Sequence, residues 1–456
     1  MRLSTEARRI PFHPPAPVRC GYAEADLEAP LEASMPGYFS DRKASGVLDP
    51  LKAKVVYLEH GATKGAIVML DLVGFGYDHV RACREATARA TGIPADSIWI
   101  HATHTHTGAM VSRSFTSDAE SIAPGIYVGT PDAAWVASIP GRVAATIAAA
   151  RDAAKSSSVR LGQARVEGVA FYRRFKMKDG TVKTNPGVGN PQIVAPAGEI
   201  DPGLTLLACP ESKTAIAIYG VHPDVIGGTQ YSADYPAMVA STFQAKAGAG
   251  WNLLYLNAAC GNINHVDVSN RMQKKGKEES DRIGRALGEG AARALTDSKG
   301  LEVDALRFSS RRVPSRLRTV PEDVVKEAER ILKDDPAKAN QFNGLFAPAA
   351  LVLGRTRDRE QVAEISALRV GSLALVGMPG EIFVELAREL QHESPFEPTR
   401  LIGLTNGSLG YIPTEAAFAE GGYETGYRSA RFEPRTGHLW VAAALELLRD
   451  LASPIR

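Results

Sequence analysis

Short apolar runs alternate with a helical segment in the first hundred residues of the chain. Residues 53–58 and 66–72 are rich in Val, Ile and Leu over almost their full length, which is typical of strands buried on both faces. Residues 77–91 are alanine-rich with apolar positions at helical intervals, and Gly92 follows as a stop signal. A further apolar run covers residues 97–101. This strand, helix, strand order predicts an α/β fold.

The same alternation continues to the end of the chain. We expect one large α/β domain over residues 21–456, with mixed β-sheets flanked by helices, preceded by an irregular proline-spaced arm over residues 1–20. Residues 334–362 are mixed in character and are expected to form a surface insertion. Further strands are expected at 204–207, 214–219, 251–256, 364–370, 373–376 and 400–404, and helices at 133–155 (broken at Pro140), 279–294, 321–333, 382–391 and 438–451.

Charge and composition exclude several classes of protein. The 456 residues contain 53 Lys and Arg against 51 Asp and Glu, so no excess positive charge points to a nucleic-acid partner. The four cysteines have no C-x-x-C spacing, which suits a reducing compartment. We find no apolar signal segment at the start and no run of about 20 apolar residues. These features predict a cytoplasmic protein without stable membrane insertion; a homo-oligomer is left open.

His104 and His106 form the sharpest local pattern. In an extended segment, residues two apart face the same side, so both imidazoles can reach one site. A His-x-His pair at the end of a strand suits a divalent transition metal such as zinc. The alternative is two polar loop residues bonded to water and backbone. The spacing alone leaves both interpretations open.

Polar residues also follow three other predicted strands. His222 comes after the strand ending at Tyr219, and Glu381 and Tyr411 each come after a Gly that follows a buried strand. Functional groups in open α/β sheets gather at the carboxyl ends of strands. Taken singly, each residue also suits an ordinary structural role.

Cys260 offers a different chemistry. A cysteine close to His265 can act as a thiolate nucleophile if the histidine or a helix N-terminus lowers its pKa. A cysteine at the end of an apolar strand is more often a small buried hydrophobe. We prefer the buried interpretation.

Taken together, these residues resemble a known family, the neutral ceramidases. These enzymes are zinc amidases that cleave the N-acyl bond of ceramide. The resemblance extends from about residue 20 to the last helix. The family's A-T-H-T-H-[ST]-G motif is present unbroken at residues 102–108. Shorter segments occur in the family's order: Val221-His222-Pro223, Pro379-Gly380-Glu381-Ile382, Tyr411-Ile412-Pro413-Thr414 and Tyr423-Glu424-Thr425, with weaker similarity at Met35-Pro36-Gly37-Tyr38 and at Asp71.

The resemblance implies a zinc ion held by His104, His222, Glu381 and Tyr411. Two imidazoles and a carboxylate leave zinc a position for water, which zinc converts to hydroxide for attack on an amide carbonyl. It also implies that His106 is a catalytic or supporting histidine able to protonate the leaving amine.

Three further roles concern substrate and intermediate. One arginine of the pair Arg173 and Arg174 is expected to contact the substrate or to stabilise the tetrahedral intermediate, and the sequence does not decide which. Arg174 is assigned the catalytic role and Arg173 a substrate contact. Tyr423 is expected to bind substrate as well.

The sequence departs from the family at one catalytic position and at its end. The family has G-D-V-S-P-N, with a serine pointing into the active site, where this chain has Gly261-Asn262-Ile263-Asn264-His265. Asn264 is thus expected to donate a hydrogen bond to an oxyanion, but it cannot be a nucleophile. We also expect no C-terminal immunoglobulin-like domain and a small-molecule amide substrate, small or lipid-like, other than ceramide itself.

Three functions follow. The first is zinc-dependent hydrolysis of a linear C–N amide bond. The second keeps the same zinc site but cleaves an ester or lactone. The third is a non-catalytic relative that binds a lipid or metabolite, and it is disfavoured because a binding protein does not need an open zinc position. Residues 125–127, 341–347 and 421–427 are expected to shape the substrate pocket.

Overall fold

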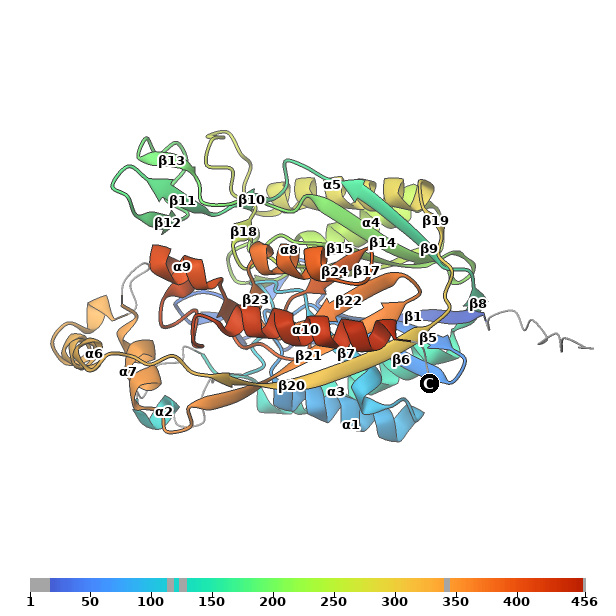
Figure 1. Cartoon of the computed structure of the whole chain (residues 1–456), viewed down its shortest axis with the longest axis horizontal. Helices are drawn as coiled ribbons and strands as arrows, with labels where there is room; N and C mark the ends of the chain where they lie inside the picture. The colour runs from blue at the N-terminus through green and yellow to red at the C-terminus, as the bar shows by residue number, and fades with distance from the viewer. Residues whose placement is uncertain (1–16, 113–118, 123–128, 340–344, 454–456) are drawn as a thin grey trace, which may run out of the picture.

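The computed structural model describes residues 17–112, 119–122, 129–339 and 345–453. Three mixed or antiparallel sheets form the body of the molecule, and helices cover them (Figure 1). The α/β architecture with mixed sheets flanked by helices is therefore confirmed.

The first sheet contains five strands in the order β7-β6-β5-β1-β8. Neighbours are antiparallel except for β6 and β7, which run parallel. Helices α1 (Tyr77–Thr91) and α3 (Ala133–Asp152) pack together, and α3 contacts β1 and β5. Gly92 ends α1 in the left-handed conformation, as the sequence predicts. The strands are β1 (Val18–Asp26), β5 (Lys52–His60), β6 (Thr63–Leu70), β7 (Ile98–Ala102) and β8 (Lys155–Ser157).

The second sheet also has five strands, in the order β17-β15-β14-β9-β19. Helix α4 (Tyr235–Ala247) packs on β17, and helix α5 (Gly276–Thr296) packs on β9 and β14. The parallel pair β15 and β17 is buried along nearly its whole length. The strands are β9 (Arg160–Arg165), β14 (Gly203–Cys209), β15 (Thr214–Tyr219), β17 (Asn252–Asn257) and β19 (Lys299–Gly300).

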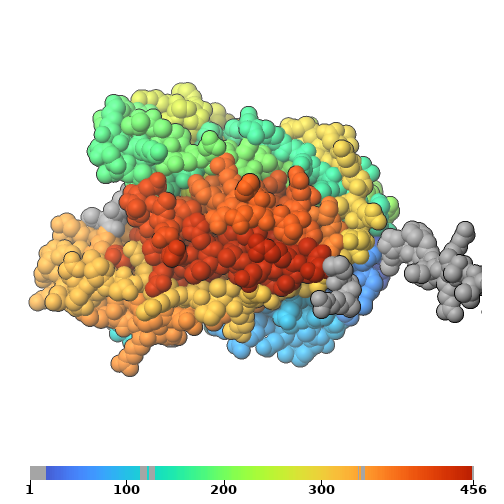
Figure 2. All heavy atoms as spheres, in the orientation of Figure 1, coloured from blue at the N-terminus to red at the C-terminus, as the bar shows by residue number. Residues whose placement is uncertain are grey.

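The third sheet has the order β20-β21-β22-β24 and belongs to the last third of the chain. Helix α10 (Thr436–Ala452) lies on β20 and β21, and α8 (Val384–Glu393) contacts both α10 and β24. The strands are β20 (Leu306–Arg316), β21 (Glu360–Val370), β22 (Leu373–Gly377) and β24 (Thr399–Ile402). Figure 2 shows the red C-terminal residues facing the viewer, with green residues of the middle of the chain above them and yellow, orange and blue residues below.

Short elements complete the described structure. The paired strands are β2 (Ser34–Met35) with β3 (Arg42–Lys43), β4 (Gly46–Val47) with β16 (Gln230–Tyr231), β10 (Phe171–Tyr172) with β18 (Ile263–Asn264), β11 (Arg174–Met177) with β12 (Val182–Thr184) and β13 (Ile193–Pro196), and β23 (Glu381–Ile382) with β25 (Tyr411–Ile412). The remaining helices are α2 (Ala119–Ile122), α6 (Glu322–Asp334), α7 (Ala347–Arg355), α9 (Glu415–Glu420) and the 3-10 turns η1 (Ala95–Ser97), η2 (Pro210–Ser212), η3 (Pro336–Lys338) and η4 (Tyr423–Thr425).

The edge strands of the three sheets meet at one place. An isolated bridge joins His101 of β7 to Thr405, which follows β24, and another joins Ile402 of β24 to Ala258, which follows β17. The loops that leave the carboxyl ends of β7, β17 and β24 therefore start from neighbouring points. This convergence is what allows distant segments to contribute to one site.

Three sequence expectations need correction. Helix α3 continues through Pro140 without a break, because its buried residues on both sides, Ile139 and Val143, hold it in the core. The arm is shorter than expected, since β1 begins at Val18; residues 1–16 lie outside the described residues. The predicted surface insertion at 334–362 contains α7, which packs on α6 with most of its side chains buried.

The sequence led us to expect no apolar segment long enough to span a membrane, and helix α3 is an exception by length and composition. Among the described residues it is the one helix long and apolar enough, by length and composition alone, to cross a membrane. In this structure Trp135, Ile139, Val143 and Ile147 pack into the core below the first sheet. Buried core helices share this composition, so α3 is weak evidence for a membrane span.

Candidate functional site

His104 lies two residues beyond the end of β7 in a constrained backbone conformation. Its φ is 76°, a left-handed value that non-glycine residues adopt rarely and that often marks functional positions. Its backbone N–H donates to the Leu72 carbonyl, and its Nδ1 lies 2.5 Å from the Val73 carbonyl oxygen. That contact fixes the proton on Nδ1 and leaves Nε2 as a free ligand atom pointing inward.

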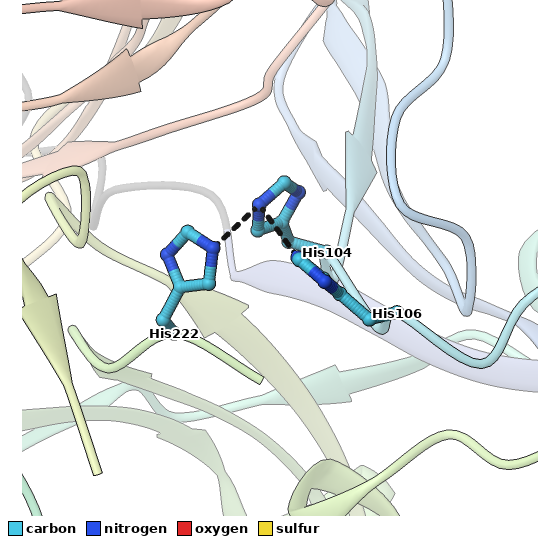
Figure 3. A group of neighbouring side chains, drawn as sticks. All are labelled: His104, His106 and His222. Atoms are coloured by element: carbon cyan, nitrogen blue, oxygen red, sulfur yellow. Dashed lines mark hydrogen bonds between the residues drawn. The ribbon is translucent and has the colours of Figure 1, made fainter. Parts of the chain in front are cut away.

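Three imidazoles converge in this region. His104 Nε2 lies 3.1 Å from Nε2 of His222 and 3.4 Å from Nε2 of His106, and the rings point toward one another (Figure 3). One nitrogen of each ring lies within 4.8 Å of the others. His104 and His106 come from the loop after β7, whereas His222 follows β15. The structure therefore joins the His-x-His pattern to a third histidine more than a hundred residues away.

Glu381 completes the cluster from the C-terminal third of the chain. Its Oε2 lies 3.2 Å from His104 Nε2 and 3.8 Å from His222 Nε2. This oxygen is buried and has no hydrogen-bond partner among the described residues. Tyr411 stands beside Glu381 on the neighbouring strand, and its ring stacks parallel to His222 with centroids 6.4 Å apart.

The charge states of the cluster suit metal binding. Burial opposes ionisation of Glu381, but the positive potential of His104 and His222 outweighs it and lowers the pKa of the carboxyl to about 2. Burial and the neighbouring His104 lower the pKa of His106 to about 4, and burial with the charge of Arg173 holds the pKa of His222 well below its usual value. His104 differs, because the Glu381 carboxylate raises the pKa of its imidazole against the effect of burial. The Glu381 carboxylate and the neutral imidazoles of His106 and His222 are already in the forms that ligate metals, whereas His104 would release a proton when a metal binds.

The residues present fit a zinc ion. Inward-facing imidazole nitrogens and a buried carboxylate oxygen without a partner form a donor set that zinc prefers. An unpartnered buried carboxylate oxygen is costly unless a cation or a donor satisfies it. His104, His222 and Glu381 would hold the metal, with Tyr411 adjacent.

Comparison with solved structures places this arrangement in a known fold. A structure described as neutral ceramidase from Pseudomonas aeruginosa matches with a TM-score of 0.72 and 17% sequence identity, covering 97% of this chain and 76% of that one. A structure described as ceramidase complexed with C2 matches with a TM-score of 0.73 and the same identity and coverage. The chain has a neutral-ceramidase-like fold. No family model and no curated protein matches the sequence.

Within this neutral-ceramidase-like fold the two adjacent arginines have different surroundings. Arg173 stacks over the Tyr411 ring at 5.3 Å, and its guanidinium donates to Glu424 and to the Gly261 carbonyl. Arg174 is fully buried and donates to Glu424, Glu420 and the Gly421 carbonyl. Arg173 is therefore the arginine beside the cluster. The contacts of Arg174 tie β11 to the segment around α9 and η4, and its expected catalytic role stays a prediction.

Asn264 and Tyr423 differ in how they relate to the cluster. Asn264 is buried in β18, where its amide donates to Asn185 and its oxygen accepts the Val266 N–H. The oxygen and one of the two amide hydrogens are thus engaged, and the expected role of Asn264 as an oxyanion donor stays a prediction. Tyr423 packs edge-on against Tyr411 at 5.7 Å, next to the cluster, where a substrate contact is feasible.

Cys260 has no feature of a nucleophile. Burial raises the pKa of its thiol, and its sulfur accepts a hydrogen bond from Asn257. His265 is paired with Asp224 at 3.2 Å instead. The cysteine's carbonyl oxygen lies 3.4 Å from His222 Nδ1, so its backbone helps to orient a histidine of the cluster.

The N-terminal segment contributes contacts that sequence reasoning missed. The Tyr38 ring packs edge-on against His106 at 5.5 Å, and the His106 carbonyl accepts a hydrogen bond from Arg42. Gly37 has a φ of 102°, and a Cβ there would lie 2.8 Å from His106 Cγ, so only glycine fits. The weak family similarity at residues 35–38 was the available signal.

Aromatic side chains extend outward from Tyr411. Phe39, Phe346 and Tyr423 lie with their ring centroids 5.5 to 6.2 Å apart. Of the loops expected to shape the pocket, 421–427 and the end of 341–347 therefore reach this region. Residues 125–127 and 341–344 lie outside the described residues.

Proposed function

We propose that the protein is a zinc-dependent hydrolase that cleaves the amide bond of a small or lipid-like N-acyl compound. The observation that carries the proposal is the buried Glu381 Oε2, which makes no hydrogen bond and lies 3.2 Å from His104 Nε2 and 3.8 Å from His222 Nε2. The ceramidase fold of the chain supports amide bonds as the substrate class. A bound zinc ion would supply a Lewis acid and an activated water at neutral pH.

The protein's own groups would position and protonate the substrate. His106 is buried and neutral, and its Nε2 faces the cluster, so it can take up a proton and deliver it to the nitrogen of the departing amine. The phenol of Tyr411 and the guanidinium of Arg173 lie together on one side of the cluster. They are the donors available to a developing oxyanion.

The surroundings of the cluster combine aromatic rings with one cation, because the Arg428 guanidinium lies over the rings of Phe39 and Phe346. Phe39, Phe346 and Tyr423 form the aromatic surface next to Tyr411. Such a surface would hold a hydrocarbon chain while keeping water from the reacting carbon. Substrate selection would then come from the length and shape of the acyl group.

The test combines metal analysis with a matched substrate series. Purified protein should contain about one zinc per chain and should lose metal and amide-cleaving activity together on chelation. Turnover should be compared on N-acyl amines and on the corresponding acyl esters with the same acyl chain. Faster specific cleavage of the ester series would favour the esterase alternative, and absence of bound metal after expression with zinc would refute the proposal.

A further inference from the structure

Arg428 contributes a positive charge to the aromatic surface beside the histidine cluster. It lies in the segment between η4 and α10, and its Cζ is 4.5 Å from the ring centroid of Phe39 and 5.5 Å from that of Phe346. Both rings contact Tyr423, which packs against Tyr411. A cation over aromatic faces is held there by their negative electrostatic potential. The guanidinium therefore belongs to the group of side chains that the substrate of the proposed hydrolase would meet.

The guanidinium of Arg428 has no acidic partner among the described residues. Within them, one of its five N–H groups is used, in a long hydrogen bond from Nη2 to the Tyr38 carbonyl oxygen at 3.4 Å. Neither Nε nor Nη1 makes a hydrogen bond in the described part of the chain, and neither is closed off from solvent. Burial lowers the pKa of Arg428, with Tyr423 opposing that effect. Arg428 can therefore donate to a bound molecule without breaking a strong internal contact.

Other enclosed arginines of the molecule are satisfied by the protein itself. Arg84 binds the Glu364 carboxylate through two hydrogen bonds of 2.8 and 2.7 Å. Arg42 instead donates to three backbone carbonyl oxygens at 2.5 to 2.7 Å. Arg428 has neither arrangement. A partly enclosed charge is costly without such partners, and an anionic group on a bound molecule would offset that cost.

Tyr38 connects Arg428 to the histidine that is proposed to protonate the leaving amine. The Tyr38 carbonyl accepts the hydrogen bond from Arg428, while the Tyr38 ring packs edge-on against His106 at 5.5 Å. In the proposed reaction His106 delivers a proton to the departing nitrogen, so the amine half of the substrate must lie on the His106 side of the cluster. This shared neighbour associates the free guanidinium with the amine half of the substrate.

We propose that the substrate carries a carboxylate on its amine half, as N-acyl amino acids do, and that Arg428 binds this carboxylate. The inference rests on the proposed hydrolase function and narrows its substrate class. Guanidinium N–H groups bind the two oxygens of a carboxylate in parallel, which adds direction to the attraction of opposite charges. Hydrolysis consumes one water and releases a carboxylic acid and the free amino acid.

Calorimetric titration of the metal-loaded full chain tests recognition of the carboxylate independently of turnover. The probes are octanesulfonylglycine and its neutral counterpart octanesulfonylglycinamide, in which a sulfonyl group replaces the scissile carbonyl and prevents hydrolysis. Wild type should bind the acid about tenfold or more tightly than the neutral probe, because the acid gains charge-assisted hydrogen bonds to Arg428.

Variants locate the carboxylate site. The preference for the acid should disappear in Arg428→Gln and be partly retained in Arg428→Lys, which keeps the charge but not the paired N–H groups. Arg435→Gln is the matched control: it removes the same charge from a side chain that is 79% exposed, and it should keep the full preference. Thermal melts compare the folding of all three variants with that of wild type.

Turnover then assigns the carboxylate to one half of the substrate. N-octanoylglycine and N-octanoylglycinamide are compared with suberic acid monopropylamide, whose carboxylate ends the acyl half. Arg428→Gln should lower kcat/KM for N-octanoylglycine about tenfold or more, mainly through KM, and change that for N-octanoylglycinamide less than twofold. A merely structural role of Arg428 would lower both values together.

Three results would overturn the proposal: equal affinity of wild type for the two sulfonyl probes, a preference that survives in Arg428→Gln, or a loss of turnover confined to suberic acid monopropylamide. The first of these needs no variant, so the proposal can fail even if Arg428→Gln does not fold. Absence of turnover on every amide, with the preference for octanesulfonylglycine intact in wild type and lost in Arg428→Gln, would refute the hydrolase function and still support the carboxylate site at Arg428.

Discussion

Glu381 and Tyr411 stand directly opposite each other on the parallel strands β23 and β25. The pairing places a buried carboxylate and a phenol side by side, and the Glu381 N–H donates to the Gly410 carbonyl at 2.9 Å. Both strands are only two residues long, so this register is set by the surrounding segments rather than by an extended ladder. The position of two candidate ligands therefore depends on loops of the C-terminal third.

Removing a ligand should remove the metal. His104→Ala, His222→Ala and Glu381→Ala are each expected to abolish stoichiometric zinc and amide-cleaving activity, because three protein ligands are the minimum for a catalytic zinc site. Elemental analysis and turnover assays on the same preparations check this. His106→Ala is the matched control: it should keep its metal and lose activity. Retained activity in two of the three ligand variants would contradict the proposed zinc-dependent mechanism.

Tyr411→Phe should separate metal binding from catalysis. Burial raises the pKa of the Tyr411 phenol, so it is a neutral and weak ligand but a usable hydrogen-bond donor. We expect zinc content close to wild type and kcat lower by roughly a hundredfold, the typical cost of losing one oxyanion donor. Loss of zinc in parallel with activity would instead identify Tyr411 as an essential ligand.

Glu424 should matter for stability more than any other acidic residue near the site. It is fully buried and accepts hydrogen bonds from Arg173, Arg174 and Thr184. Glu424→Gln leaves two buried guanidinium groups short of a partner and should cost about 3–5 kcal/mol in the free energy of unfolding. Glu420→Gln, which removes a partly exposed partner of Arg174, should cost less than about 1 kcal/mol. Denaturant melts of both variants compare them.

Cys260→Ala should leave catalysis almost unchanged. The thiol is buried with a raised pKa, and it is the backbone carbonyl of this residue, which alanine retains, that lies near His222. We expect kcat within about twofold of wild type and a stability loss of about 1 kcal/mol. A large fall in kcat at full zinc occupancy would reopen the nucleophile hypothesis.

Replacing Asp71 by Asn should change the free energy of unfolding by an amount that depends on pH. Burial raises its pKa to about 7, with Lys54 and the Lys52 N–H partly opposing that shift. The folded state thus holds this proton more tightly than the unfolded chain, whose aspartates titrate near pH 4. Stability from this group is present at low pH and is lost as the pH rises from about 4 to about 7. The asparagine side chain of Asp71→Asn cannot ionise. The free energy of unfolding of this variant relative to wild type should therefore increase from about pH 4 to about pH 7 and then level off.

Urea melts at several pH values measure this difference. Wild type and Asp71→Asn should be compared in the same buffers, because other groups titrate in both and cancel. Stability curves that run parallel from pH 4 to pH 7 would show that Asp71 does not carry the raised pKa.

Local sequence patterns predicted the elements that deliver the site. The apolar runs before His104, His222 and Glu381 placed these residues after buried strands, and the structure brings their side chains together. Sequence alone did not separate Arg173 from Arg174. Which of the two arginines lies beside the cluster depends on the break between β10 and β11 at residue 173. The spacing of apolar residues in the sequence does not reveal such a local irregularity.

Contacts across the fold were harder to foresee. Tyr38 against His106, and α7 packed on α6, both involve segments whose local sequence resembles a surface loop. Likewise, Asn264 stands where the family's G-D-V-S-P-N motif has its serine, yet its amide donates to Asn185, a residue in a different segment. Hydrogen-bond partners distant in sequence leave no periodic signal.

The meeting point of the three edge strands has a consequence for how the protein matures. The imidazoles and the carboxylate come from residues 104 to 381, and Tyr411 follows later still, so every member depends on contacts of large sequence separation. Such contacts form late and slowly, after much chain entropy has been lost. Newly made chains would therefore have no assembled site until the last third has been synthesised and has docked, and metal uptake would report completion of folding.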